Sequence, residues 1–246
     1  MHILDDLTDL STRAKGLLER TGRREQPQNS PGIAQHLQAG NHGGHLIPSP
    51  MTFLIRREGF DLRYGGLRYQ VRRSYSLGGE RRESVRDWHY DLGGYQWTDP
   101  AGGGYFDWFG ERVSSPLRYL VHTDGRVGAE DGTSVFLEIA PSIPALIESH
   151  ALTDMVSAWE CHPADADILR LARTLDGLDD IPEASGPTVQ WRLSDDVAVQ
   201  EFQNCSSTEP RHWRAFIWFR GEAGRIQIEA ATKSAGTDDP SPSAAA

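Results

Sequence analysis

Cysteine is nearly missing from this sequence, with only Cys161 and Cys205 in 246 residues. Two cysteines are too few for a disulfide framework, so they indicate a reducing cytosol, although one bridge between them stays open. No run approaches the roughly 18 apolar residues of a membrane-spanning helix. Residues 1–6 are acidic and lack the basic and apolar regions of a secretion signal. We therefore expect a cytoplasmic protein.

Basic charge is scarce as well. Lys and Arg total 25 against 35 Asp and Glu, which gives a net charge of -10. Nucleic acid phosphates and anionic lipids both require a basic surface, so neither is expected as a partner. The charge favours a protein partner, and that partner could itself be basic.

Catalytic signatures are absent too. There is no Gly-x-Ser-x-Gly elbow, and Gly102-Gly103-Gly104 lacks the lysine of a phosphate-binding loop. His212 follows Cys205 in a polar turn, and a base can activate a thiol, but such a cysteine is more often buried or idle. Asp91, Asp99 and Asp107 stand beside aromatics, which leaves glycosidase-like carboxylates at a sugar site open, although such aromatics are more often core. We predict no catalytic residue; an enzyme of hydrolase type with an unrecognised site is the alternative.

Metal-ligand patterns are weak. His36, His42 and His45 lie in a predicted loop with no cysteine nearby, whereas structural zinc normally takes four ligands, often including Cys. His150 and Cys161 are three helical turns apart, about 16 Å by the rise per residue, so they share no ion on a straight helix. We predict no metal and no cofactor.

Apolar residues recur at helical spacing in three segments. The first predicts an N-terminal helix over residues 3–20, stopped by Gly22. The second predicts a central helix over 142–159, opened by Pro141 or Ser142, and the third a helix over 164–175.

Residues 22–50 have no sustained period and are rich in Pro and Gly. They predict an irregular connector, with one helical turn at 33–37. Strands are expected from Met51 on.

The clearest predicted hairpin spans residues 61–71. Gly65-Gly66 separates two runs that alternate apolar and polar side chains, and glycine readily takes the positive φ of a two-residue turn. Together with the Asp124-Gly125 turn, it predicts a β-rich core over residues 51–140.

In the C-terminal part of the chain, apolar and polar residues again alternate as in β-strands. Residues 188–232 predict a β-meander, since short turns allow no parallel crossover. Gly, Asp, Pro, Ser and Ala dominate residues 234–246, which predicts a disordered tail. We expect one domain, 1–233, of the α+β class: a twisted antiparallel β-sheet meander with an N-terminal helix and two central helices.

A run of arginines follows the predicted hairpin: Arg72, Arg73, Arg81, Arg82 and Arg86. It is offset by three acids, Glu80, Glu83 and Asp87. Mixed-sign charge is normal on a surface, so a solvated edge is the favoured interpretation. A local basic spot for an acidic ligand is the alternative.

Aromatic residues are concentrated between Phe60 and Tyr119, where more than half of all Phe, Trp and Tyr lie. Such residues are usually core, but exposed ones would hold a partner, because large rigid side chains lose little entropy when buried. The candidate binding residues are Trp97, Tyr105, Trp108, Asp99 and Asp107.

The order of elements from Met51 to Trp159 resembles the SUKH superfamily, bacterial proteins many of which are immunity proteins for polymorphic toxins. Residues 119–128 and 142–152 carry the resemblance, as a strand pair with a Gly-containing turn that leads to a helix beginning after a serine. The connector 22–50 and the segment 188–232 depart from it. The resemblance implies a non-enzymatic cytosolic protein that binds and neutralises a protein toxin.

Three functions therefore stay open: an immunity-type binding protein, an enzyme, and a structural or assembly component. A binding protein should expose an aromatic patch rimmed by acid. An enzyme should instead show a concave pocket with converging titratable groups.

Overall fold

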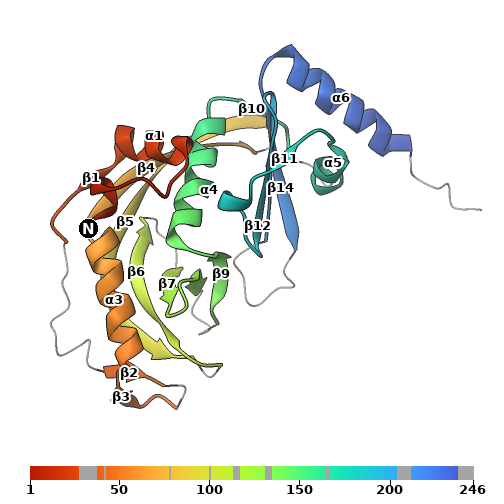
Figure 1. Ribbon diagram of the computed structural model, residues 1–246. Coiled ribbons are helices and arrows are strands. Elements are labelled where there is room, and N and C mark those ends of the chain that lie inside the picture. Colours follow the sequence, from red (N-terminus) through yellow and green to blue (C-terminus); the bar gives the residue numbers. More distant parts are fainter. Residues whose placement is uncertain are drawn as a thin grey trace, which may run out of the picture.

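A computed structural model describes residues 1–27, 38–41, 43–77, 79–99, 101–112, 117–130, 135–164, 167–203 and 212–237. Its two β-sheets lie on either side of one helix, α4 (Ile143–Val156), as Figure 1 shows. The α+β class and the antiparallel character of the sheets are confirmed, apart from a single parallel bridge between Gly40 and Trp97.

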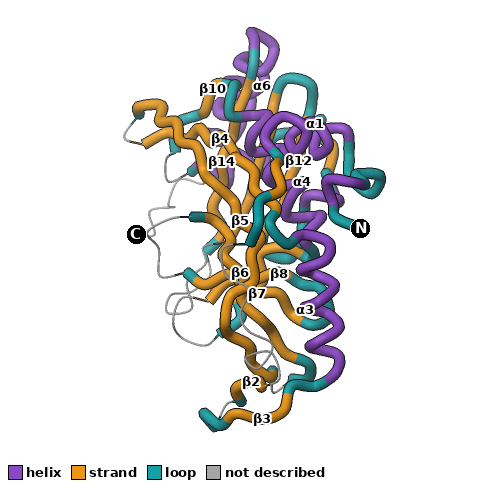
Figure 2. Tube along the Cα trace, turned by 90° about the vertical axis from the view of Figure 1, so that its left-hand side faces the viewer, coloured by secondary structure: helices purple, strands orange, loops and turns teal. Residues whose placement is uncertain are grey.

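The first sheet carries most of the aromatic strands. Its main strands follow in the order β1 (Arg23–Arg24), β4 (Leu67–Leu77), β5 (Glu80–Thr98), β6 (Gly104–Glu111), β7 (Arg118–His122), β8 (Val127–Glu130) and β9 (Leu137–Ala140). Two short strands, β2 (Gln38–Gly40) and β3 (Leu46–Pro48), extend it at β5. Helices α1 (Thr12–Thr21), α3 (Met51–Tyr64) and α4 line one side of this sheet (Figure 2).

The second sheet follows α4 in the chain. Its strands lie in the order β10 (Glu160–Cys161), β14 (Trp213–Phe219), β13 (Val197–Gln203), β12 (Val189–Leu193) and β11 (Asp179–Asp180). Helices α5 (Ile168–Thr174) and α6 (Gly221–Thr237) pack with β13 and β14 around a separate apolar core. The chain thus has an apolar core beside each sheet.

Helix α4 joins the two halves because it is buried on nearly all sides. Ile147 and Ala151 pack in the core of the first sheet. Leu152 and Val156 instead pack against Trp191 and Trp218 of the second. An apolar helix of this kind is typical of an interior position between two layers. The predicted central helix is confirmed, with Ser142 as its N-cap and its end at Val156.

Two polar residues, Glu148 and Asp154, fix α4 against the elements of the first half. Glu148 accepts hydrogen bonds from the backbone N–H and the hydroxyl of Ser11, at 2.6 and 2.5 Å. Asp154 accepts from the backbone and guanidinium of Arg72 and from Arg20. Trp218 donates its indole N–H to the backbone oxygen of Ser74 at 3.1 Å, which ties the second sheet to β4.

The N-terminal helix predicted over 3–20 is split in the structure. Ile3–Asp5 forms a 3-10 turn, and α1 begins only after Ser11. The cause is local, because Asp6 accepts hydrogen bonds from the backbone and hydroxyl of Thr8 and holds a turn there. Ser11 then accepts from Ala14 as an N-cap.

The hairpin predicted over 61–71 is wrong. Residues 51–64 form α3, and Gly65, at φ -55°, caps its C-terminus. Phe53, Arg57 and Phe60 are buried at helical spacing, while Leu62, which the alternation had placed inside, is 66% exposed. The helical period of 51–64 therefore prevails over the shorter alternation that begins before Gly65-Gly66. Only the second run, from Leu67, becomes a strand.

The C-terminal meander is correct for β12, β13 and β14 and wrong beyond them. Residues 221–237 form α6 in place of the strand expected at 225–230. Glu222 and Glu229 pair with Arg225 at helical spacing, and Ile228 is buried while Ile226 is exposed. The tail expected from residue 234 is helical to Thr237; the remainder, 238–246, lies outside the described residues.

Two smaller predictions have mixed outcomes. The helix expected over 164–175 is present as α5 but begins at Ile168. The connector 22–50 contains the short strands β1, β2 and β3, and the helical turn expected at 33–37 lies outside the described residues. Within the described ranges, no helix combines the length and the apolar character needed to cross a membrane.

Candidate functional site

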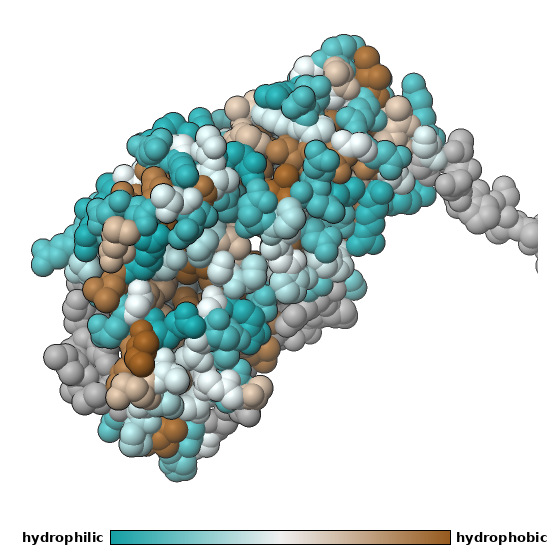
Figure 3. All heavy atoms as spheres, viewed as in Figure 1, coloured by the Kyte–Doolittle hydropathy of each residue, from teal (hydrophilic) through white to brown (hydrophobic). Residues whose placement is uncertain are grey.

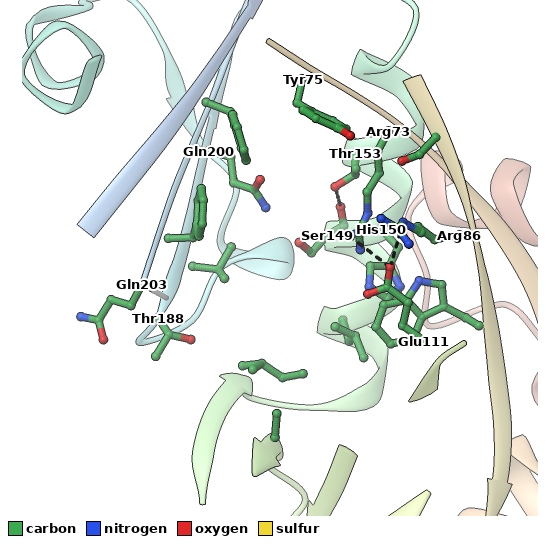
Figure 4. A pocket seen from close by; sticks show the side chains of 18 of the residues that line it. Arg73, Tyr75, Arg86, Glu111, Ser149, His150, Thr153, Thr188, Gln200 and Gln203 are labelled. Carbon is green, nitrogen blue, oxygen red and sulfur yellow. Dashed lines mark hydrogen bonds and ion pairs between the residues drawn. The ribbon is translucent and has the colours of Figure 1, made fainter. Parts of the chain in front are cut away.

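The main cavity of interest is a cleft between the two sheets, with α4 as its floor (Figure 4). Its volume is about 330 Å³, which lies at the lower end of the range of small-molecule sites. One wall comes from β4, β5 and the end of β6, and the opposite wall from β12, β13 and β14. The two walls differ in chemistry.

The wall from the first sheet is cationic. One oxygen of Glu111 lies 3.4 Å from Arg73 Nη1 and 3.3 Å from Arg86 Nε. The other oxygen accepts from the Tyr119 hydroxyl at 3.3 Å. The side chains of Arg73 and Arg86 are 34% and 38% exposed, whereas that of Glu111 is 11% exposed. Both arginine side chains are therefore partly exposed, whereas the carboxylate between them is nearly buried and already has partners at both oxygens.

Strand register explains why these groups meet. Arg73 pairs with Ser84, and Val71 with Arg86, across β4 and β5. Alternation places Arg73 on the same face as Val71 and Tyr69, which precede it in β4 and are buried. Where the apolar core of the first sheet ends, that face continues as arginine and serine.

Unpartnered donors line the same wall. The hydroxyls of Ser74 and Ser84 and the indole N–H of Trp88 are buried and have no hydrogen-bond partner among the described residues. Ser74 and Trp88 are 3% and 2% exposed. Buried donors normally have partners, so these groups are available to an acceptor that enters the cleft.

His150 lies in the floor of the cleft and is held in a chain of hydrogen bonds. Its Nδ1 lies 2.7 Å from the Tyr69 hydroxyl, which lies 2.7 Å from that of Tyr90. Its ring packs 4.0 Å from the centroid of Trp88. Burial, with a smaller contribution from Arg73, holds the pKa of His150 well below its ordinary value of 6.5. The imidazole is therefore neutral and adds no charge to the cleft.

The wall from the second sheet is mainly apolar. Phe202 and Phe216 stack with their centroids 5.1 Å apart, and Phe216 lies 5.6 Å from Trp218. Gln200, Gln203 and Thr188 add neutral polar groups on the same side of the cavity, as Figure 4 shows. The cleft thus sets a cationic wall against an aromatic one.

The depressed pKa of His150 predicts a pH dependence of stability. Unfolded His150 binds a proton near pH 6.5 but folded His150 does not, so the free energy of unfolding is highest above pH 6.5 and falls as the pH is lowered. His2 and His89, whose pKa values burial also lowers, act in the same direction. We expect His150→Phe to reduce the slope between pH 7 and 5 in urea titrations, by up to about 1.4 kcal/mol per pH unit. The exposed His45, changed to Phe, is the control; equal slopes in both variants would contradict the assignment.

The candidate binding residues from the sequence lie elsewhere, mostly on the opposite face of the first sheet. Trp97 stacks on Tyr95 at 5.2 Å and lies 5.8 Å from Tyr105. Burial and Asp99 raise the pKa of the Tyr105 hydroxyl. Trp97 and Asp99 are half-buried and Tyr105 is buried, so the structure brings these three together with limited exposure. Tyr95 is the more exposed aromatic there, at 54%.

The two other candidates are interior. Trp108 is 2% exposed and packs against Tyr90 at 4.5 Å, so it belongs to the core. Asp107 is buried and accepts from the backbone N–H of Tyr95 at 2.8 Å; burial raises the pKa of its carboxyl. Their burial leaves neither available to a partner in this structure.

The remaining candidates do not come together. Cys161 lies half-buried in β10, and burial raises the pKa of its thiol. Cys205, His36 and His42 lie outside the described residues, while His212 is exposed. Among the residues with described positions, no three His, Cys, Asp or Glu side chains are grouped to hold a metal.

Sequence reasoning missed the cleft. Arg73 and Arg86 belong to the run of arginines for which the sequence favours a solvated edge, with a basic spot for an acidic ligand as the alternative. Glu111 gave no signal in the sequence, and His150 gave one only as a metal ligand with Cys161. Their neighbours come from the register of β5 with β6 and from the packing of α4. One signal was available, because Arg73 and Arg86 fall on the apolar face once β4 and β5 are paired.

No model of a known protein family matches the chain, and comparisons with curated proteins and with solved structures gave no match. The SUKH resemblance therefore stays a prediction.

Proposed function

We propose that this chain is a binding protein that receives an acidic group of its partner in the cleft between the two sheets. The observation that carries the proposal is the sharing of one carboxylate, Glu111, by two arginines whose side chains are both about a third exposed. Arginine presents its N–H donors in a planar fork that suits a second carboxylate. Two cations and one anion leave one uncompensated positive charge in the cleft.

The same contacts favour binding over hydrolysis. Both oxygens of Glu111 are occupied, and His150 directs its Nδ1 to Tyr69. Among the described residues of the cleft, no serine or threonine hydroxyl is bonded to His150 or Glu111, whereas a nucleophile requires such a base. The hydrolase and the structural component stay alternatives.

A protein partner in the cytoplasm, and an immunity-type role toward a toxin, belong to this proposal. Net charge supports a basic partner, because the acidic surface of the chain would accelerate its approach at low salt. The one uncompensated positive charge of the cleft requires one acidic group on that partner. A basic protein that presents a single carboxylate meets both requirements.

Binding of matched acids and amides tests the proposal. We expect acetate and butyrate to bind in calorimetric titrations at constant ionic strength, and acetamide and butyramide not to bind. Arg86→Gln should weaken acid binding about tenfold or more, since a hydrogen bond to a charged group is worth about 1.5–3 kcal/mol.

Arg82→Gln is the matched control, because Arg82 lies on the same strand, is exposed and pairs with Glu80. It should bind acids as the unaltered chain does. Equal binding of acids and amides, or undiminished acid binding in Arg86→Gln, would refute the proposal.

A further inference from the structure

We infer that the group taken by the cleft is a carboxylate attached to a flat apolar group, so that one ligand spans both walls. This inference rests on the proposed function and specifies its ligand. Three observations carry it: the charge balance at the cationic wall, the aromatic character of the opposite wall, and the position of both on one cavity of about 330 Å³.

The charge balance favours a carboxylate over a phosphate. Arg73 and Arg86 carry two positive charges, and Glu111 already cancels one of them. His150 is neutral because its pKa lies well below 6.5, so it adds none. A monoanion neutralises what remains, whereas a phosphate dianion would bring its second charge against Glu111. Like charges at close range in a partly buried site are unfavourable.

The opposite wall supplies a surface for a flat group. Phe202 and Phe216 are stacked side by side on β13 and β14 and are both half-buried, so part of each ring faces the cavity that they line. Aromatic rings prefer offset or edge-to-face contacts with other rings. A planar apolar group placed there would bury both rings further.

Two kinds of ligand carry a carboxylate attached to a flat apolar group: a free aryl-substituted acid and the C-terminal residue of a partner chain. In the second, the α-carboxylate would lie at Arg73 and Arg86 and the terminal side chain at Phe202 and Phe216. The cleft is reached from solvent at its arginine side, since both arginine side chains are about a third exposed. A chain end would enter from that side.

Affinities of the full chain for paired probes test the inference. We expect 3-phenylpropionate to bind at least about tenfold more tightly than butyrate, because its ring removes apolar area from water. Phe202→Ala should remove most of this advantage, and a far-ultraviolet circular dichroism spectrum equal to that of the unaltered chain shows that the variant is folded. Phe202→Leu, which keeps an apolar side chain, should lose less. Inorganic phosphate should bind more weakly than 3-phenylpropionate.

The source is read from two peptides, Gly-Gly-Gly-Phe with a free and with an amidated C-terminus. If the peptide with a free C-terminus binds and the amidated peptide does not, the ligand is a chain end. If 3-phenylpropionate binds and neither peptide binds, the ligand is a free acid. Equal affinity for butyrate and 3-phenylpropionate, or tighter binding of phosphate, overturns the inference but leaves the proposed function standing. If no acid binds at all, both fail.

Discussion

Arg68→Met is expected to lower the free energy of unfolding by about 3–5 kcal/mol, because it leaves a buried carboxylate without its cation. The side chains of Arg68 and Asp91 are each 1% exposed. Arg68 Nη1 donates to Asp91 Oδ1, and Arg68 Nη2 donates to Asp91 Oδ2. Arg68 also donates to the backbone oxygen of Leu67 at 3.1 Å. Urea titrations followed by circular dichroism measure the loss.

Arg82→Met is the control for this prediction. Arg82 lies on the neighbouring strand β5 and forms an ion pair in which both side chains are more than half exposed. Its replacement should change the free energy of unfolding by no more than about 0.5 kcal/mol. The double variant Arg68→Met, Asp91→Leu should recover much of the loss, since an apolar pair can replace a buried ion pair. A loss in Arg68→Met no larger than in Arg82→Met would show that the pair is not buried as described.

Leu152→Ala is expected to destabilise both halves of the chain together, by about 2–5 kcal/mol. Leu152 is fully buried on α4 and packs against Trp191 and Trp218 of the second sheet. The other side of α4 packs in the first core, so both sheets depend on the same helix. Unfolding should remain a single transition in the unaltered chain and in the variant.

Near-ultraviolet and far-ultraviolet circular dichroism, with tryptophan fluorescence, should give coincident urea curves for each protein. Leu62→Ala is the control, because Leu62 is 66% exposed on α3 and its truncation leaves no cavity. Two separate transitions, only one of which shifts in Leu152→Ala, would contradict the single domain expected over residues 1–233.

Long apolar segments with a clear start were predictable from the sequence. The central helix is one, since its apolar residues continue over four turns and Ser142 caps it. Predictions failed where two periods overlap. At 51–64 the pattern of Phe53, Arg57 and Phe60 competes with a shorter alternation, and Arg57 hides the helix because a buried arginine reads as a polar position. At 225–230 the two isoleucines alternate as in a strand, but burial of only Ile228 identifies a helix.

The candidate site was less predictable because its parts come from different elements. The concentration of aromatic residues makes Trp108 a candidate binding residue in the sequence, but in the structure it lies in the core. Arg73, Arg86 and Glu111 meet only through the register of three strands. Phe202 and Phe216 reach the same cavity only because α4 holds the second sheet beside the first. Figure 3 fits this picture, since polar residues dominate the displayed face and apolar ones form small separate areas, which leaves no extended apolar surface there.

The position of the bound acid is the most direct test of the account. The chain has seven tryptophans, and each gives an indole N–H resonance in a nitrogen-15 correlation spectrum. Trp88 lines the cleft, whereas Trp97 lies with Tyr95 on the opposite face of the first sheet. On addition of 3-phenylpropionate, the account predicts a saturable shift of the Trp88 resonance, absent in Arg86→Gln, with Trp97 unchanged. A shift of Trp97 with Trp88 unmoved would contradict it and would place binding at the aromatic surface.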